Sequence, residues 1–281
     1  MTITNKLSLP QPILRAIERD DYDRGKSDFT VTELLNPPRQ RALIKQHADE
    51  ITEDVSDRLF ALFGQIGHTI LERAGMDEYV ERRFYATVDG KIVGGKADLI
   101  LKPGNKAKLI DYKFCSHYTV KEGIKPEWTA QINMLRFLAK EDCGIEIDEA
   151  EIMAIYWPES VKHGNVKDPA SVFPVELWSM TDTGAYIAQR ISAHLNAEIA
   201  LPFCTNEERW ASKEQWAVMK LGRKSALKLH DSIESAQGQI NTLPAGHYIE
   251  HRPCEYRRCL KYCAAAPFCS QFKNTWQQCA A

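Results

Sequence analysis

The feature that most restricts the fold of this chain is a change in the spacing of its apolar residues. They recur at helical intervals over about Glu53–Ala74, whereas over residues 81–114 they alternate with polar residues, as in a strand with one buried face. The pair Asp89-Gly90 interrupts the alternation and is a strong signal for a hairpin turn. We therefore expect a long helix followed by antiparallel strands, with the returning strand at Lys91–Leu101 and a third strand at Lys108–Phe114.

Strands and helices continue to alternate through the second half of the chain. A helix begins at Pro126, at a position where proline is tolerated. Two apolar strands follow at Ile152–Trp157 and Val172–Trp178, and a long helix spans Asp182–Glu198. This order predicts an α/β fold in which helices flank a mixed central sheet. Hydrophobic residues make up 44% of the chain and charged residues 26%, which supports a packed core and excludes intrinsic disorder.

Composition divides the 281 residues into three parts. Residues 1–27 are polar and interrupted by proline, so we expect a loose arm with one short helix. Residues 28–200 carry the strands and helices of the core. Residues 201–281 are enriched in tryptophan, lysine and cysteine and are expected to form a small C-terminal module.

Charge and hydropathy restrict the surroundings in which the chain works. The sequence has no apolar run of the length that a membrane span needs and no apolar signal core near its start, so we expect a cytoplasmic protein with no membrane partner. The net charge of −2 excludes a globally basic surface. Binding to nucleic acid would therefore depend on local basic patches.

The predicted strands bring two carboxylates and one lysine together. Asp111 and Lys113 share one face of a strand because side chains alternate, and Asp98 lies on the preceding strand, which returns through a turn at Lys102–Asn105. Neighbouring carboxylates repel unless a cation lies between them, and oxygen ligands with bound water suit Mg²⁺ or Mn²⁺. A lysine beside such an ion can orient water and offset the charge on a phosphodiester. The alternative is an exposed hairpin with a surface ion pair.

Companion motifs surround these residues in a fixed order. They are Gly64-Gln-Ile-Gly-His-Thr-Ile-Leu-Glu72, Gly95-Lys-Ala-Asp98, Asp111-Tyr-Lys113 and Gln131-Ile-Asn-Met-Leu135. In this order they resemble the motifs of the RecB-like branch of the PD-(D/E)xK nuclease superfamily. That branch includes the AddB nuclease domain, lambda-type exonucleases, the iron–sulfur exonuclease of CRISPR adaptation and phage-encoded relatives. The resemblance covers roughly residues 28–140 and the terminal cysteines, and it implies a restriction-endonuclease-like core.

The resemblance implies a role for each matching position. Lys113 would position the attacking water, and Gln131 would orient the substrate or Lys113. Leu135 departs from the pattern, because it stands where the family usually has tyrosine. The implied ligands of Mg²⁺ or Mn²⁺ are His68, Asp98, Asp111 and the carbonyl of Tyr112.

The helix pattern gives an independent view of His68. This residue lies nearly opposite an apolar stripe that runs from Val55 to Ile70 and that we expect to be the core-facing side. Gly64 and Gly67 share the side of His68, and glycines there let another part of the chain approach closely. The spacing favours a histidine that faces a site, and the alternative is a solvated surface histidine. Glu81 is read as a strand-edge charge and, more weakly, as an outer metal contact.

Cysteines crowd the end of the chain, where five of the eight lie in the last thirty residues. In a reducing compartment this crowding favours metal or cluster ligation over disulfides. Cys259, Cys263 and Cys269 resemble the terminal trio of the iron–sulfur nucleases, with one extra residue in the first gap, and imply a 4Fe-4S cluster that needs a fourth thiolate. Cys204 is our preferred fourth ligand and Cys254 the alternative. Zinc suits these spacings less well, because no C-x₂-C pair occurs, but it stays an alternative, as does a metal-free tail.

Local basic patches supply candidate contacts for DNA, namely Arg39, Lys220, Arg223 and Lys224. The alternative is a solvated, charged surface. Together with the resemblance, these residues predict a divalent-metal-dependent deoxyribonuclease, an exonuclease that acts on DNA ends, including single-stranded ends. A helicase or recombination protein is a candidate partner. The competing functions are a non-catalytic DNA-binding adaptor of the same fold and a site-specific endonuclease.

Overall fold

The computed structural model describes residues 2–18, 23–75, 79–102, 107–164 and 166–279, and it divides the chain into two compact units. The first unit comprises residues 1–41 and 52–201, and the second comprises residues 42–51 and 202–281. The division at residue 201 falls next to the expected boundary of the core. Residues 42–51 were expected in the core and instead belong with the second unit. The turn expected at Lys102–Asn105 lies largely outside the described residues.

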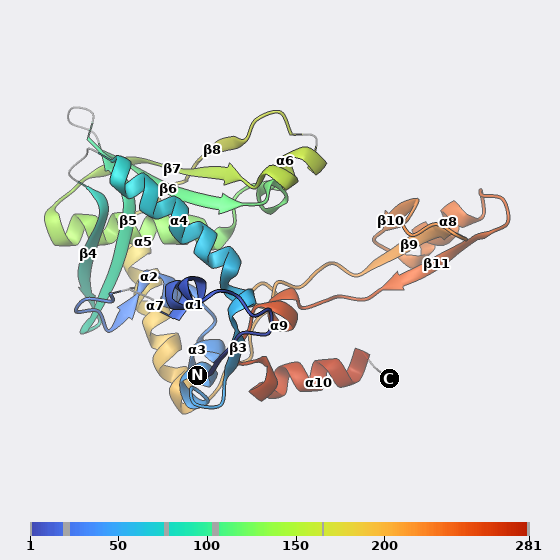
Figure 1. The fold of residues 1–281 in the computed structure, drawn as a ribbon, viewed down its shortest axis with the longest axis horizontal. Coiled ribbons are helices and arrows are strands. Elements are labelled where there is room, and N and C mark those ends of the chain that lie inside the picture. The colour runs from blue at the N-terminus through green and yellow to red at the C-terminus, as the bar shows by residue number, and fades with distance from the viewer. Residues whose placement is uncertain (1, 19–22, 76–78, 103–106, 165, 280–281) are drawn as a thin grey trace. The chain divides into compact units, whose positions relative to one another are not determined.

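The first unit is built on a mixed six-stranded sheet (Figure 1). The strands are β2 (Phe29–Thr30), β4 (Val80–Val88), β5 (Lys91–Leu101), β6 (Ala107–Cys115), β7 (Ile147–Tyr156) and β8 (Ala170–Pro174). Their order is β2-β5-β6-β7-β8, and β4 pairs with β5. The pairs β2–β5 and β6–β7 are parallel, whereas β4–β5, β5–β6 and β7–β8 are antiparallel. The α/β fold with a mixed, helix-flanked sheet is confirmed.

Helices cover both faces of this sheet. Neighbouring side chains of β6 point to opposite faces, so Phe114 packs against α4 at Gly67 while Lys113 bonds to Gln131 of α5.

No helix among the described residues combines the length and the apolar character that crossing a membrane would require. The helices of this unit are α1 (Gln11–Glu18), α2 (Val31–Leu35), the first half of α3 (Pro38–Gln46), α4 (Leu59–Ala74), α5 (Pro126–Cys143), α6 (Pro158–Gly164) and α7 (Met180–Ile199), with short 3₁₀ turns at Val55–Arg58 and His117–Val120.

The strands β5 and β6 diverge along their length, and this divergence positions the site. Their ladder pairs Leu99–Leu101 with residues 108–110 and ends there. Because β4 occupies the other edge of β5, the strand β2 uses the same edge as β6, and it pairs with Val93 and Gly94. Residues 95–98 of β5 therefore have no partner strand on this edge in the described ladders. A gap bordered by Asp98 opens in the sheet at this point.

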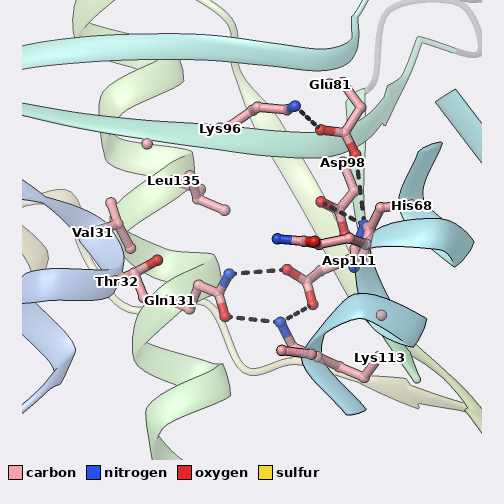
Figure 2. A pocket seen from close by; sticks show the side chains of 14 residues that line it. Val31, Thr32, His68, Glu81, Lys96, Asp98, Asp111, Lys113, Gln131 and Leu135 are labelled. Carbon is pink, nitrogen blue, oxygen red and sulfur yellow. Dashed lines mark hydrogen bonds and ion pairs between the residues drawn. The ribbon is translucent and has the colours of Figure 1, made fainter. Parts of the chain in front are cut away.

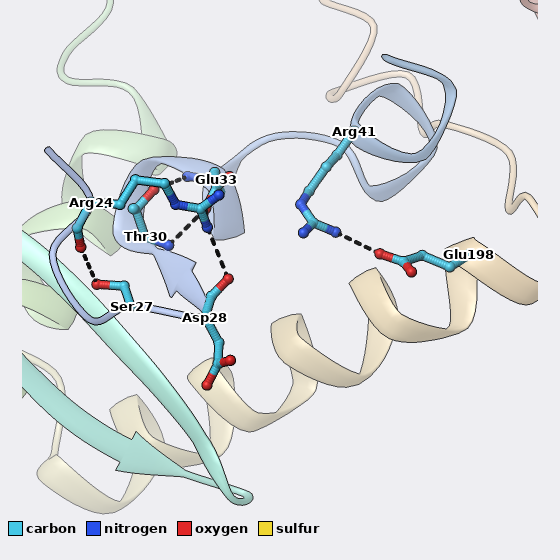
Figure 3. A network of polar contacts seen from close by, with 7 residues as sticks. All are labelled: Arg24, Ser27, Asp28, Thr30, Glu33, Arg41 and Glu198. Carbon is cyan, nitrogen blue, oxygen red and sulfur yellow. Dashed lines mark hydrogen bonds and ion pairs between the residues drawn. The ribbon is translucent and has the colours of Figure 1, made fainter. Parts of the chain in front are cut away.

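The short strand β2 and the helix α2 are fixed by a polar network (Figure 3). Thr30 caps α2 by accepting a hydrogen bond from the Glu33 amide, and the Glu33 carboxylate accepts one from the Thr30 amide, which is a capping box. Arg24 donates to the same carboxylate and to the carbonyl of Asp28. The network places the first turn of α2, with Val31 buried, beside the gap between β5 and β6.

The first residues of the chain are more ordered than the loose arm that we expected. Strand β1 (Thr2–Thr4) pairs in parallel with β3 (Thr52–Asp54). The Asp54 carboxylate accepts hydrogen bonds from the Thr4 hydroxyl, the Lys6 amide and Ser56. These contacts tie the start of the chain to the residues around Asp54.

The apolar stripe of α4 does not face the core, which contradicts our expectation. Phe63, Ile66 and Ile70 are exposed, as is Phe60, and α4 contains no buried residue. Only Val55, in the turn before the helix, is buried. The opposite side of α4, which carries Gly67 and His68, is the side that meets the sheet.

The second unit contains a three-stranded antiparallel sheet with β9 (Gln215–Lys220) between β10 (Lys228–His230) and β11 (His247–Arg252). Helix α8 (Ile233–Ile240) packs on this sheet, where buried His230 hydrogen-bonds to Ser235 and Gln239. None of these elements was expected from the sequence. The unit also contains the second half of α3, α9 (Arg257–Lys261), a 3₁₀ turn at Ala266–Phe268 and α10 (Ser270–Cys279).

Candidate active site

A cavity of about 410 Å³ lies in the first unit at the gap between β5 and β6. Helices α2, α4 and α5 complete its walls (Figure 2). One side is apolar, and the other carries three carboxylates, one imidazole and two ammonium groups. The lining residues are Val31, Thr32, Ala61, Gly64, Gln65, His68, Glu81, Gly95, Lys96, Asp98, Asp111, Lys113, Gln131 and Leu135.

His68, Glu81 and Asp98 each direct one ligand atom toward a common point. The Nδ1 atom of His68 lies 3.5 Å from Oε1 of Glu81 and 3.5 Å from Oδ1 of Asp98. All three ligand atoms lie within 4.8 Å of one another. An imidazole nitrogen and two carboxylate oxygens at this spacing can bind one divalent cation and leave positions for water.

The second oxygen of each carboxylate is held by a separate donor. Oδ2 of Asp98 accepts a hydrogen bond of 2.8 Å from the backbone amide of Tyr112, which lies just beyond the end of the β5–β6 ladder. Oε2 of Glu81 forms an ion pair of 2.5 Å with the Lys96 ammonium. Figure 2 shows the Lys96–Glu81 pair together with the contacts of His68 with Glu81 and Asp98. One oxygen of each carboxylate is thus fixed, and the other stays directed toward His68.

Asp111, Lys113 and Gln131 form a closed triangle beside the first group (Figure 2). The Lys113 ammonium lies 2.6 Å from Oδ2 of Asp111 and donates a hydrogen bond of 2.9 Å to Oε1 of Gln131. The Gln131 amide in turn donates to Oδ1 of Asp111 at 3.2 Å. The side chain of Lys113 is 19% exposed, so its charge can act on a ligand in the cavity.

Asp98 is the carboxylate of the site that lacks a fixed cation. Lys96 pairs with Glu81 and Lys113 with Asp111, and within the described residues Asp98 has no lysine or arginine partner of this kind. Burial raises the pKa of Asp98 to about 6, and the neighbouring charge of Asp111 contributes to the rise. A cation bound to Asp98 would stabilise its ionised form and so offset both of these causes.

A second, smaller cavity adjoins the same carboxylates. Its volume is about 40 Å³, which is enough for a water molecule or a small cation. Glu81, Asp98 and Tyr112 line it, together with Glu72 of α4. Because the amide and carbonyl of one strand residue point to the same edge, the Tyr112 carbonyl faces the gap as its amide does. This direction agrees with the predicted ligand role of Tyr112.

The structure therefore places every predicted residue of the nuclease motifs at one cavity or beside it. Leu135, the departure from the family pattern, is 2% exposed and contacts Gly95, so it forms part of the apolar wall. Glu81 was expected mainly as a strand-edge charge, whereas the structure groups it with His68 and Asp98 as a candidate ligand. It has φ of +50° and stands opposite Asp98, at a position that the β4–β5 ladder skips. The sequence did contain one signal: counting outward in both directions from the Asp89-Gly90 turn brings Glu81 opposite Asp98.

Only one of the two glycines on the His68 side of α4 is needed for close packing. A Cβ atom at Gly67 would lie 2.3 Å from the Phe114 ring, whereas one at Gly64 would meet no atom within 4 Å. Gly67 therefore lets α4 lie directly on β6, and this contact sets the height of His68 above the sheet. The expectation of a close approach is confirmed at Gly67 and wrong at Gly64.

Four of the predicted cysteines gather in the second unit. The pKa of Cys204 is raised to about 12 by burial, with contributions from Glu208, Cys269, Cys259 and Cys263. Burial also raises the pKa of Cys263 to about 11. Neighbouring thiols of high pKa hold their protons unless a metal replaces them. Cys204 thus lies close enough to the other three thiols to respond to them, and Gln271 holds it by accepting from its amide at 2.8 Å and donating to its carbonyl at 2.9 Å.

The predicted DNA contacts differ in their exposure. Lys220, Arg223 and Lys224 are exposed at the end of β9 and in the turn that follows. Arg39 is only 3% exposed and donates a hydrogen bond to the carbonyl of Leu201. The burial of Arg39 and its contact with Leu201 do not support the predicted DNA contact, which stays a prediction.

No protein-family model matches this chain, and no curated protein matches it either. Among solved structures, the chain is similar to a crystal structure of SSO0001, with 16% sequence identity. The similarity covers 70% of this chain and 87% of that one, with a TM-score of 0.48.

Proposed function

We propose that this chain is a Mg²⁺- or Mn²⁺-dependent deoxyribonuclease. The observation that carries the proposal is Asp98, a buried carboxylate grouped with His68 and Glu81 and next to the Asp111–Lys113 pair. Among the residues that the structure describes, it has no lysine or arginine partner. A non-catalytic adaptor would have no need to keep a buried, destabilising carboxylate beside a correctly placed lysine.

Each residue has a part in the proposed hydrolysis. His68, Glu81 and Asp98 would hold the cation, and Asp111 and the Tyr112 carbonyl are further candidate ligands. The cation would polarise the phosphodiester and lower the pKa of a bound water. Lys113 would direct this water and offset the charge that grows on the phosphate, because its ammonium is held at the cavity by Asp111 and Gln131.

We propose DNA ends as the substrate, with single-stranded ends included. A cavity of about 410 Å³ has the size for a single nucleotide unit rather than for an intact duplex. The exposed Lys220, Arg223 and Lys224 supply a basic turn that can neutralise phosphates. The proposed setting is the cytoplasm, and a helicase or recombination protein that produces such ends is the class of partner we propose.

We further propose that Cys204, Cys259, Cys263 and Cys269 bind a 4Fe-4S cluster. Four thiols that affect one another's protonation fit the four thiolates that such a cluster takes. Zinc is the alternative metal, and the spacing of these cysteines in the sequence suits it less well, because no C-x₂-C pair occurs. The role of the cluster would be structural, because hydrolysis needs no redox step.

A cleavage assay tests the proposed function. End-labelled single- and double-stranded DNA and a closed circle are incubated with Mn²⁺, with EDTA as the metal-free control. We expect loss of the end label, an intact circle, and no cleavage by Lys113→Ala or Asp98→Ala. Lys108→Ala is a matched control, because Lys108 lies on the same strand as Lys113 but pairs with Glu151. Cleavage by Lys113→Ala at the parental rate would overturn the assignment, and cleavage of the circle would favour an endonuclease.

A further inference from the structure

We infer that Lys96 is a positioning residue that orients Glu81 for the metal. This inference rests on the proposed metal site and concerns a residue that touches neither the reacting atoms nor the cation. Lys96 is two residues before Asp98 on β5, so the two side chains lie on the same face of the strand. The side chain of Lys96 is 39% exposed and reaches Glu81 from the rim of the cavity.

The register of the sheet explains how Lys96 reaches its partner. On β4, the residue opposite Lys96 is Arg83, and the residue opposite Ala97 is Arg82. Glu81 is therefore a diagonal neighbour of Lys96, at a separation that only a long side chain can bridge. The carboxylate of Glu81 is 8% exposed, so few other donors can approach it.

The two oxygens of Glu81 have different uses. Oε2 lies 2.5 Å from the Lys96 ammonium, and Oε1 lies 3.5 Å from Nδ1 of His68, toward the proposed cation. The two oxygens of Asp98 are divided in the same way: Oδ2 accepts a hydrogen bond from the Tyr112 amide, and Oδ1 lies 3.5 Å from Nδ1 of His68. A donor on one oxygen fixes the rotation of a carboxylate and leaves the other oxygen directed at the metal. Partners of this kind around metal ligands change metal affinity by about 10–100-fold when they are removed.

The charge of Lys96 and its contact with Glu81 have opposite effects on metal affinity. A positive group near the site repels a divalent cation, so removal of the charge alone would raise metal affinity. Loss of orientation would lower it. The direction of the change in a Lys96→Met variant therefore separates the two effects, because methionine keeps an unbranched stem but has neither the charge nor the donor.

Calorimetric titration with Mn²⁺ of the full chain, without DNA, provides the test. We expect Lys96→Met to bind Mn²⁺ at least tenfold more weakly than the parent, and Lys96→Arg, which keeps a donor, to stay within about threefold of it. Lys108→Met is the matched control, because the Lys108–Glu151 pair has the same 2.5 Å separation and similar exposure. That pair lies on the opposite face of β6 from Asp111, and its loss should leave Mn²⁺ affinity unchanged.

A second background separates orientation from any damage to the fold. If Lys96 acts through Glu81, then Lys96→Met should no longer weaken Mn²⁺ binding when Glu81→Gln is already present. Unchanged or tighter binding by Lys96→Met in the parental chain would overturn the inference while leaving the metal site in place. An equal loss of Mn²⁺ affinity in the parental and Glu81→Gln backgrounds would also overturn the inference. A parental chain that binds no Mn²⁺ would overturn the proposed function itself, and this inference with it.

Discussion

Two glycines on one helix provide a matched test of how the site is built. Replacing Gly67 by alanine puts a methyl carbon 2.3 Å from Cζ of Phe114, with three ring atoms within 2.7 Å. Ordinary contacts between carbon atoms are about 3.5–4.0 Å. The ring or the helix must therefore shift by more than about 1 Å, at a cost of about 1–3 kcal/mol for overpacking.

The same substitution at Gly64 has the opposite expected effect on stability. No atom lies within 4 Å of the new methyl group there. Alanine is favoured over glycine inside a helix by about 1 kcal/mol, so Gly64→Ala should stabilise the first unit by about that amount. The same gain applies at Gly67, which leaves that variant about 1–3 kcal/mol less stable than Gly64→Ala.

Thermal unfolding followed by circular dichroism measures this difference. For a unit of this size, 1 kcal/mol corresponds to about 2–4 °C, so we expect the melting temperature of Gly67→Ala to lie about 2–12 °C below that of Gly64→Ala. Because His68 follows Gly67 directly, Mn²⁺ affinity should fall in Gly67→Ala and stay near the parental value in Gly64→Ala. Equal melting temperatures for the two variants would refute the close packing of α4 on β6.

Three further predictions follow from the ionisable and polar groups. The raised pKa of Asp98, about 6 against 3.8, means that the folded state binds more protons than the unfolded state between those values, so metal-free stability falls as pH rises from about 4 to 6. Asp98→Asn should therefore be more stable than the metal-free parent at pH 8, by up to about 3 kcal/mol in urea unfolding, and an equally stable variant would contradict the burial argument. Cys204→Ser should lose the iron and the visible absorbance of anaerobically purified protein while Cys254→Ser keeps them, and the reverse result would move the fourth ligand to Cys254. Gln271→Ala should shorten the lifetime of that absorbance in the presence of a chelator, because it releases both backbone contacts of Cys204, and an unchanged lifetime would remove Gln271 from the account.

Local signals in the sequence predicted the strands around the site well. The hairpin at Asp89-Gly90, the strand Lys91–Leu101 and the helix that begins at Pro126 all occur where expected. These elements are specified by turn residues, alternation and proline placement, which act over a few residues. The pairing of Asp111 and Lys113 on one face follows from the same alternation.

Features that depend on distant parts of the chain were not predictable in this way. Periodicity showed that α4 is amphipathic, but not that its exposed side would be the apolar one. The register of the Asp89-Gly90 turn places Glu81 opposite Asp98, but the skipped ladder position and the positive φ at Glu81 have no clear signature in one sequence. Arg39 reads as a surface cation, yet a carbonyl 162 residues away accepts its hydrogen bond.

The position of a bound cation tests the central claim most directly. A crystal of the parental chain soaked in Mn²⁺ and measured for anomalous scattering would locate the ion. We predict a peak about 2.2 Å from Nδ1 of His68, Oε1 of Glu81 and Oδ1 of Asp98, on the side that faces Lys113. A Mn²⁺ peak elsewhere, or the absence of any peak at these three atoms in a crystal that binds Mn²⁺, would contradict the proposed site.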